Sequence, residues 1–552
     1  MPDPDFLNIA AHLPVMAQQQ PDAPAVIVQG KESLSGTYSY TRFSARELDD
    51  ESNRLARGLL QAGIGHGVRT VLMVKPSLEF FALTFALFKA GAVPVMVDPG
   101  MGIRNLGKCL AEAEPHAFIG IPRAHAARVV LRWAARTNRI NVTVGLRLFW
   151  GGATLNQLRH DDPSFEMALT KPDEIAAILF TSGSTGVPKG VVYTHNIFEA
   201  QVRCLRDQYA IAPGERDLAT FPLFALFGPA LGMAAIVPNM DASKPGAADP
   251  RAIVAAIKDH KATNLFASPA LIEKVGRFGV ENEVRLPTLK RVISAGAPAS
   301  PASLHRFKSL LSPAVSVFPS YGATEALPLC MIETQELLMD TAHETDEGKG
   351  ICVGRSLGDA TIKIIRISEE PIETWTDDLE LPQGEIGEIA VCGSVVTQRY
   401  FNRPESTVQA KIESADGGPC WHRMGDLGYM DQVGRLWFCG RKAHRVEVEG
   451  ETLFTIPCER IFDTHPKVKR TALVGVQDES KTVPVLCVEV DDEEDVVDFE
   501  YLKRELLDLG REHPQTEAIT TLLRHPGFPV DVRHNAKIFR EKLALWAEGQ
   551  LR

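Results

Sequence analysis

The chain of 552 residues is 45% apolar and 23% charged, a balance typical of globular proteins, and its length favours several domains. Its formal net charge of −11 argues against a general nucleic-acid-binding role, so we expect no nucleic-acid partner. The sequence shows no apolar run near the roughly 20 residues that cross a bilayer, no basic-then-apolar leader and no closely spaced pair among its cysteines, so we expect a cytoplasmic protein with free thiols.

Residues 37–99 alternate between helical and extended patterns. A turn and an amphipathic helix are predicted within 37–67, with an apolar face made of Leu48, Leu55, Leu59 and Leu60. An apolar, β-branched strand is predicted at 68–75, a second helix at 79–92 and a second strand at 93–99. A strand, a helix and a strand of these lengths form a βαβ unit, so the sequence predicts a mainly parallel sheet.

The same alternation returns further along the chain. Short apolar strands are predicted at 176–181, 291–296 and 315–320, and each runs directly into a turn rich in Gly, Ser or Thr. In open α/β sheets, ligands bind at the carboxyl ends of such strands. The region 361–438 differs, because short strands between turns predict an antiparallel, barrel-like patch there.

A domain boundary is predicted between Gly440 and Arg441. After it, strands are predicted at 470–476 and 483–490, and helices near 498–511 and 537–547. The sequence thus predicts an α/β protein in two parts. A large N-terminal domain of several subdomains, 1–440, combines mainly parallel sheets with helices and a small β-barrel, and a small α+β C-terminal domain covers 441–552.

The segment 181–190, with the sequence TSGSTGVPKG, is the strongest chemical signal. It combines four hydroxyl side chains, three glycines and Lys189 directly after a predicted strand. Glycines let the backbone approach an anion, while hydroxyls, backbone N–H groups and lysine stabilise phosphate oxygens. The spacing differs from that of a P-loop NTPase. A flexible Ser/Gly linker is the alternative interpretation, although linkers seldom lie flush between two apolar segments.

This segment resembles the phosphate-binding loop of the acyl-adenylate-forming superfamily, which includes acyl-CoA synthetases, luciferases and peptide-synthetase adenylation domains. Further segments that resemble the family's motifs follow in the family's order along nearly the whole chain. They are 294–298 for the adenine wall, 320–325 for adenine and magnesium, 423–427 for the ribose, 440–442 for the hinge and 537–540 near the C-terminus.

The resemblance implies an enzyme that uses ATP and Mg²⁺ to convert a carboxylic acid into its acyl-adenylate. It implies that Glu325 holds the metal, that Thr324 donates to the α-phosphate and that Asp426 binds the ribose with help from Arg441. The implied catalytic residues are Lys537, Glu325, Thr324 and Lys189. The implied ATP-binding residues are Thr181, Ser182, Gly183, Ser184, Thr185, Gly186, Lys189, Gly296, Ala297, Pro298, Tyr321, Gly322, Ala323, Thr324, Asp426 and Arg441. The small domain would turn about 441–443 as a mobile lid and bring in Lys537.

Three departures from the family pattern bear on a second reaction with coenzyme A. Ala225 stands where a gating His or aromatic residue is common, and Ala443 stands where Asp or Lys is usual. Glu447 and Glu449 would repel an anionic nucleotide if they faced it, whereas on a solvent-facing strand they would have no effect.

The segments 181–198, 221–241 and 534–547 also resemble the bacterial olefin-biosynthesis β-lactone synthetases. That resemblance implies a long-chain 2-alkyl-3-hydroxy fatty acid, whose own hydroxyl attacks the acyl-adenylate to give a β-lactone. It further implies a ketone reductase and a β-lactone decarboxylase as pathway partners. Long-chain acyl-CoA synthesis is the alternative activity, and a non-catalytic nucleotide-binding subunit is the alternative from another class.

Three smaller features carry weaker predictions. The apolar segment 221–233 contains Ala225, Gly228 and Gly232, which could leave room for alkyl chains, unless the segment is a plain core helix. The basic stretch 123–139 is predicted to be a peripheral helix packed on its own domain, with at most peripheral membrane contact. His195 and His444 are candidate bases by residue type only, and we expect structural roles for both.

Overall fold

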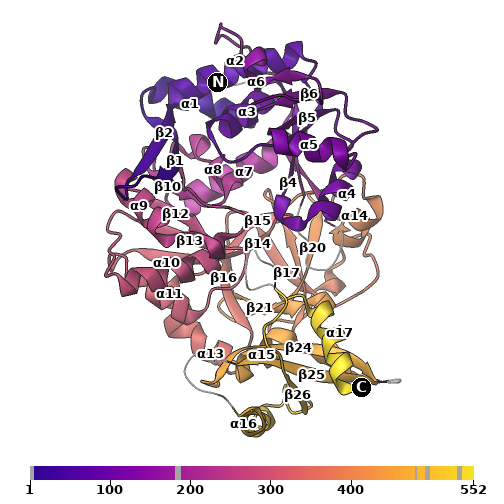
Figure 1. Cartoon of the computed structure of the whole chain (residues 1–552). Helices are drawn as coiled ribbons and strands as arrows, with labels where there is room; N and C mark the ends of the chain where they lie inside the picture. The colour runs from indigo at the N-terminus through magenta and orange to yellow at the C-terminus, as the bar shows by residue number, and fades with distance from the viewer. Residues whose placement is uncertain (1–4, 181–187, 479–480, 491–497, 531–537) are drawn as a thin grey trace.

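The computed structural model describes residues 5–180, 188–478, 481–490, 498–530 and 538–552 (Figure 1). Two large sheets with their helices make up most of the molecule, and a three-stranded sheet with its own helices lies at the C-terminal end. The predicted α/β fold, with a large N-terminal part and a small C-terminal part, is confirmed. Among the described residues, we find no helix with the length and apolar character that a membrane span requires.

The N-terminal sheet contains the predicted βαβ unit. The strands β3 (Arg69–Met73) and β4 (Val93–Val97) pair in parallel and are joined by α3 (Leu78–Lys89). The full order is β7-β6-β5-β3-β4-β8-β9, and only the pairing of β8 with β9 is antiparallel. The other strands are β5 (Ala117–Gly120), β6 (Ile140–Thr143), β7 (Ala153–Thr154), β8 (Ile175–Phe180) and β9 (Gly190–Thr194).

The helix α2 (Ala45–Gln61) begins at a capping box, in which Ser44 and Glu47 each accept a hydrogen bond from the other's backbone N–H. Leu48, Leu55 and Leu59 are fully buried, as predicted, but Leu60 is 46% exposed. The prediction for Leu60 is wrong because successive helical residues are about 100° apart, so two adjacent leucines cannot both point at the centre of one packed face. Three more helices belong to this part of the chain: α4 (Ile103–Ala113), α5 (Pro122–Val130) and α7 (His195–Gln208).

The second large sheet is parallel at one end and antiparallel at the other. Its parallel strands are β1 (Pro24–Glu32), β10 (Arg216–Ala219), β11 (Ala234–Val237), β12 (Asn264–Ala267), β13 (Arg291–Ala295) and β14 (Ser316–Ala323). The helices α9 (Pro250–His260), α10 (Pro269–Glu281) and α11 (Pro301–Lys308) connect and cover these strands. The antiparallel strands predicted at 361–438 are present, and β16 (Ile351–Ser356) links them through β15 (Ala326–Met331) to β14 and the parallel part of this sheet.

The antiparallel strands continue from β14 to the far edge of this sheet. They are β15 (Ala326–Met331), β16 (Ile351–Ser356), β17 (Thr361–Ile365), β18 (Gly387–Cys392), β20 (Trp421–Met430) and β21 (Leu436–Arg441). At the opposite edge, β2 (Tyr38–Ser44) pairs antiparallel with β1.

The C-terminal part has a hydrophobic core of its own, which includes Phe462, Leu473, Leu486 and Leu506. Its elements are β22 (Val446–Val448), β23 (Glu451–Leu453), α15 (Thr455–Phe462), β24 (Val468–Asp478), β25 (Lys481–Val490), α16 (Phe499–Arg511), β26 (Thr521–Arg524) and α17 (Arg540–Leu551). Arg441 is the last residue of β21 and still belongs to the large sheet. The domain boundary at 440–441 stays a prediction.

Candidate active site

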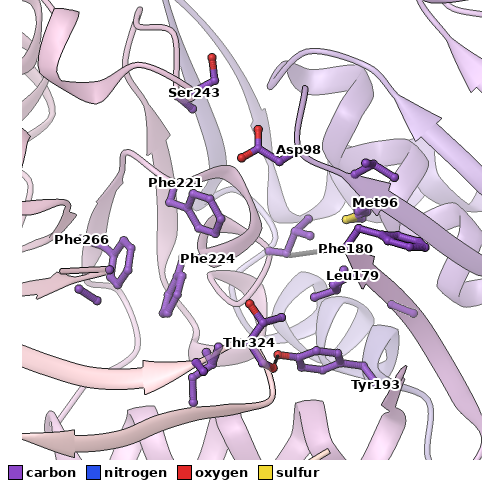
Figure 2. A pocket seen from close by; sticks show the side chains of 18 of the residues that line it. Met96, Asp98, Leu179, Phe180, Tyr193, Phe221, Phe224, Ser243, Phe266 and Thr324 are labelled. Carbon is purple, nitrogen blue, oxygen red and sulfur yellow. Dashed lines mark hydrogen bonds between the residues drawn. The ribbon is translucent and has the colours of Figure 1, made fainter. Parts of the chain in front are cut away.

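A cavity of about 1670 Å³ has walls from both large sheets (Figure 2). In Figure 2, Phe221, Phe224 and Phe266 lie on one side of it, and Met96, Leu179 and Phe180 lie on the other. Ile293 and Ala295 contribute from β13, at the carboxyl end where ligands bind in parallel α/β sheets.

The end of β14 and the turn that follows it place the segment 321–325 along this cavity. The Tyr193 hydroxyl on β9 donates a hydrogen bond of 2.5 Å to the backbone carbonyl of Thr324, and Figure 2 shows this pair at the edge of the cavity. The bond ties the turn to the strand that follows the 181–190 segment. Lys189, which immediately precedes that strand, and Thr324 both line the cavity.

The predicted ribose site is assembled from two paired strands. Asp426 on β20 and Arg441 on β21 are register partners, and Arg441 Nε lies 3.0 Å from Asp426 Oδ1. The Tyr321 hydroxyl donates to Asp426 Oδ2 over 2.6 Å. Burial and the charge of Asp426 raise the pKa of Tyr321 well above its usual value, so this phenol stays a neutral donor. The charge of Asp426 likewise raises the pKa of Arg441, which strengthens the pair.

Glu325 is held by a residue that sequence reasoning missed. The Tyr400 hydroxyl donates a 2.8 Å hydrogen bond to Glu325 Oε1, and Lys189 Nζ lies 4.8 Å from the centre of the Tyr400 ring. Tyr400 therefore contacts both the predicted metal ligand and the predicted phosphate lysine. Burial lowers the pKa of Lys189, and the nearby charge of Glu325 opposes that shift.

Tyr400 reaches this position because the chain around it pairs with β9. The Phe401 backbone N–H donates to the Gly190 carbonyl over 2.7 Å, and Val191 forms a bridge with Tyr400. A single tyrosine in an irregular segment gives no sequence signal of its own, because its role depends on a pairing between segments about 210 residues apart.

Only some of the remaining residues predicted to bind the nucleotide lie at the cavity in the part of the chain that the structure describes. Gly296 lines the cavity in the left-handed region at φ +103°, while Ala297 and Pro298 follow it in the loop, with Pro298 exposed. The segment 181–187 and Lys537 lie outside the described residues. The roles predicted for Lys537 and for Thr181, Ser182, Gly183, Ser184, Thr185 and Gly186 therefore stay predictions.

The segment 221–233, predicted to line an acyl site unless it formed a plain core helix, is divided into short elements. A short helix, α8 (Pro222–Ala225), and a 3₁₀ turn (Pro229–Leu231) replace a plain core helix. Ala225 is 1% exposed and packs in the core. A Cβ atom at Gly228 would lie 3.1 Å from the Ala225 carbonyl oxygen, and Gly232 has φ +69°. Close packing and a tight turn thus account for both glycines.

The segment's large aromatic side chains line the cavity instead. The rings of Phe224 and Phe266 stack at 3.8 Å, and Phe227 lies 6.0 Å from Phe224 and 6.1 Å from Phe198. Phe198 then stacks on Tyr193 at 4.9 Å. A continuous aromatic wall, defined as Phe266, Phe224, Phe227, Phe198 and Tyr193, thus runs from β12 to the carbonyl of Thr324.

The two candidate histidines have structural surroundings. His195 is 2% exposed, and its Nδ1 accepts a 3.2 Å hydrogen bond from the Ile9 backbone N–H. His444 lies 3.5 Å from Glu541. Burial lowers the pKa of both imidazoles to about 4.

Glu447 and Glu449, which follow the predicted hinge, are exposed to solvent and each is paired with a basic side chain. Arg445 Nε contacts Glu447 at 2.6 Å, and Lys481 contacts Glu449 at 3.0 Å. Exposure and pairing both reduce their repulsion of a passing anion.

Comparison with known proteins agrees with this site. The model of the AMP-binding enzyme family matches residues 13–401. The chain belongs to the AMP-binding enzyme family. It is 48% identical to an olefin beta-lactone synthetase of Xanthomonas campestris pv. campestris. The match spans 549 residues and covers 98% of each chain. It is 47% identical to an olefin beta-lactone synthetase of Stenotrophomonas maltophilia, over 99% of this chain and 98% of the relative. The predicted family resemblance and the predicted AMP-forming enzyme class are confirmed.

Two solved structures share the fold. The amide bond synthetase McbA from Marinactinospora thermotolerans has a TM-score of 0.78 at 22% identity, over 98% of this chain and 99% of its own. The ATP-bound MatB from Rhodopseudomonas palustris has a TM-score of 0.78 at 20% identity, over 99% of this chain and 100% of its own.

Proposed function

We propose that this enzyme uses ATP and Mg²⁺ to activate a long-chain 2-alkyl-3-hydroxy fatty acid as its acyl-adenylate, which then closes to a β-lactone. One observation supports the overall reaction: the chain is 48% identical to an olefin beta-lactone synthetase over 98% of its length. The geometry of the cavity supports each step.

The described residues fit a magnesium nucleotide. Mg²⁺ prefers oxygen ligands and is often held by one or two carboxylates together with substrate phosphates. Glu325 offers such a carboxylate, and among the described residues there is no cluster of three or more His, Cys, Asp or Glu that could hold a metal alone. A single protein carboxylate fits a metal ion that is bound mainly by the phosphates of ATP. When bound, it would neutralise phosphate charge as the carboxylate approaches.

The ribose and the phosphates would be held by two neighbouring groups of residues at the cavity. Asp426 accepts from Tyr321 and pairs with Arg441, so its carboxylate is fixed where it can accept hydrogen bonds from a ribose diol. Lys189 lies beside Tyr400 and stabilises negative charge that develops on the phosphates. In the first step, a carboxylate oxygen of the fatty acid bonds to the α-phosphorus and the bond to pyrophosphate breaks.

In the second step, the 3-hydroxyl oxygen attacks the acyl carbonyl carbon and the bond to AMP breaks. The hydroxyl proton passes to a phosphate oxygen of the departing AMP, and the products are the β-lactone and AMP. The ring is strained, but the mixed anhydride is a strong acyl donor and the nucleophile is tethered, which removes a large entropic cost. The aromatic wall holds the alkyl chains and excludes water that would hydrolyse the adenylate.

The remaining parts of the proposal concern motion and partners. The 441–552 domain turns about 441–443 and brings Lys537 to the carboxylate and ATP oxygens for adenylation. We expect a cytoplasmic enzyme that works between a ketone reductase and a β-lactone decarboxylase in long-chain olefin formation.

Mass analysis of the product from one 2-alkyl-3-hydroxy acid tests this function. With ATP and Mg²⁺ but no coenzyme A, we expect a product one water lighter than the acid, together with AMP and pyrophosphate. A thioester that forms only when coenzyme A is added, with no lactone, would instead identify an acyl-CoA synthetase. No exchange of pyrophosphate into ATP with any long-chain acid would favour the nucleotide-binding subunit.

A further inference from the structure

One region of the surface has a composition unlike the rest of the chain. Between Glu114 and Asp161 the sequence contains no Asp or Glu, although the whole chain carries a net charge of −11. Its exposed arginines include Arg123, Arg132, Arg136, Arg139 and Arg147, while the exposed Arg159 is paired with Glu51 at 2.7 Å. The nearby acids of α4 are paired, since Glu112 lies 2.6 Å from Arg403 and Glu114 lies 4.0 Å from Arg69.

Large apolar side chains are exposed among these arginines. Val130 is 76% exposed at the end of α5, and Leu146 and Phe149 are 73% and 74% exposed in the loop that follows β6. We call this set the apolar-basic surface; its apolar members are Val129, Val130, Leu131, Leu146, Leu148 and Phe149. Exposed apolar residues that gather in this way mark interaction sites, whereas single ones are ordinary.

The loop and the helix form one surface because they pack together. Trp150, next to Phe149, stacks on His125 of α5 with ring centres 5.5 Å apart. A Cβ atom at Gly145 would lie 3.8 Å from Pro122, the first residue of α5. The loop is therefore anchored against α5, and both elements present exposed apolar side chains to solvent.

The inner face of the same helix lines the active-site cavity. Ala124 and Ala127 of α5 are part of its wall, together with Ile103 and Leu106 of α4. Ile103 is itself 64% exposed, so the wall reaches the molecular surface at this point. One short helix thus separates the apolar-basic surface from the cavity.

We propose that the apolar-basic surface docks the enzyme on an anionic phospholipid bilayer, where lipophilic acid and lactone pass between the membrane and the neighbouring cavity. Aliphatic and aromatic side chains can enter the boundary between headgroups and acyl chains, while arginines contact anionic headgroups. A membrane as the source of substrate rests on the proposed function. The binding itself depends only on the surface.

Vesicle co-sedimentation of the full chain, without ATP or acid, tests the docking. We expect binding to vesicles of phosphatidylcholine with phosphatidylglycerol, much weaker binding to phosphatidylcholine alone, and release at high salt. The double variant Val130→Glu with Leu148→Glu should lower the vesicle-bound fraction by about tenfold or more. In this variant, two apolar side chains that would enter the bilayer become charged. Both side chains are exposed, so folding should be retained.

A matched control moves the same charges elsewhere. Leu34 and Val280 are 110% and 51% exposed and lie outside this surface, so Leu34→Glu with Val280→Glu should bind vesicles like the unmodified protein. All three proteins should form lactone from a short, soluble 3-hydroxy acid at the same rate, which separates docking from the proposed reaction.

Three outcomes would overturn the inference. The unmodified protein could bind anionic and neutral vesicles equally poorly, which would leave a protein partner as the occupant. The control could lose binding as much as the test variant. Light scattering could show that the test variant changes the mass of the protein in solution, which would assign the surface to contacts between copies of this chain.

Discussion

Tyr400→Phe isolates one hydrogen bond in the site. The change deletes the hydroxyl that donates to Glu325 Oε1 over 2.8 Å but keeps the ring that lies 4.8 Å from Lys189 Nζ. Tyr400 is 7% exposed, so water cannot easily replace the lost donor. A hydrogen bond to a charged group contributes about 1.5–3 kcal/mol, which corresponds to roughly 10- to 100-fold in an equilibrium constant.

Because Glu325 is the proposed metal ligand, this loss should appear in the dependence on Mg²⁺. We expect the Mg²⁺ concentration for half-maximal pyrophosphate exchange to rise by roughly 10- to 100-fold, with a smaller change in the maximal rate. Calorimetry should show weaker ATP binding with Mg²⁺ present and little change without it. A Mg²⁺ dependence equal to that of the unmodified protein would refute the reasoning.

Tyr429→Phe is the matched control for this experiment. Tyr429 lies on β20, the strand that also carries Asp426, and its ring centre is 6.0 Å from that of Trp437. It is not part of the cavity wall. Its variant should leave the Mg²⁺ dependence unchanged. An equal shift in both variants would indicate a general loss of structure.

Three further changes test other parts of the molecule. Asp426→Asn removes a charge that pairs with Arg441, so the KM for ATP should rise by roughly 10- to 100-fold in exchange assays, and an unchanged KM would contradict the ribose role. Phe224→Ala removes a ring stacked on Phe266, so KM should rise by about tenfold for long-chain acids and much less for short ones; equal effects would place the chain elsewhere. Burial would raise the pKa of Glu273, but hydrogen bonds from arginine and serine outweigh it and lower the pKa to about 2. Its stabilisation is therefore present above the ordinary glutamate pKa of 4.5 and lost as the pH falls toward 2, and urea unfolding should show a smaller loss across that window in Glu273→Gln.

Much of the fold and the family could be predicted from local pattern. The βαβ unit at 69–97 follows from periodicity, because a buried parallel strand is apolar throughout and its connecting helix has a length that the sequence shows. The motif at 181–190 is likewise contiguous, so its residue types and spacing indicate a phosphate site, while the role of 320–325 followed from the family resemblance.

Other features depend on where distant segments meet. The acyl prediction named Ala225, Gly228 and Gly232 because small residues suggest space, but backbone packing and a tight turn use them. Phe224 and Phe227 line the cavity instead, since the chain breaks into a short helix and a turn there.

The sequence by itself determined the parallel α/β class and the order of the motifs, because these depend on neighbouring residues, and the resemblance of those motifs to a family indicated the enzyme class. Only the tertiary structure decided that Tyr321, 105 residues away, donates to Asp426, and that Tyr400, 75 residues away, donates to Glu325. A hydrogen bond needs its two atoms within about 3 Å, and a linear pattern holds no such distance between strands that meet only in the folded sheet.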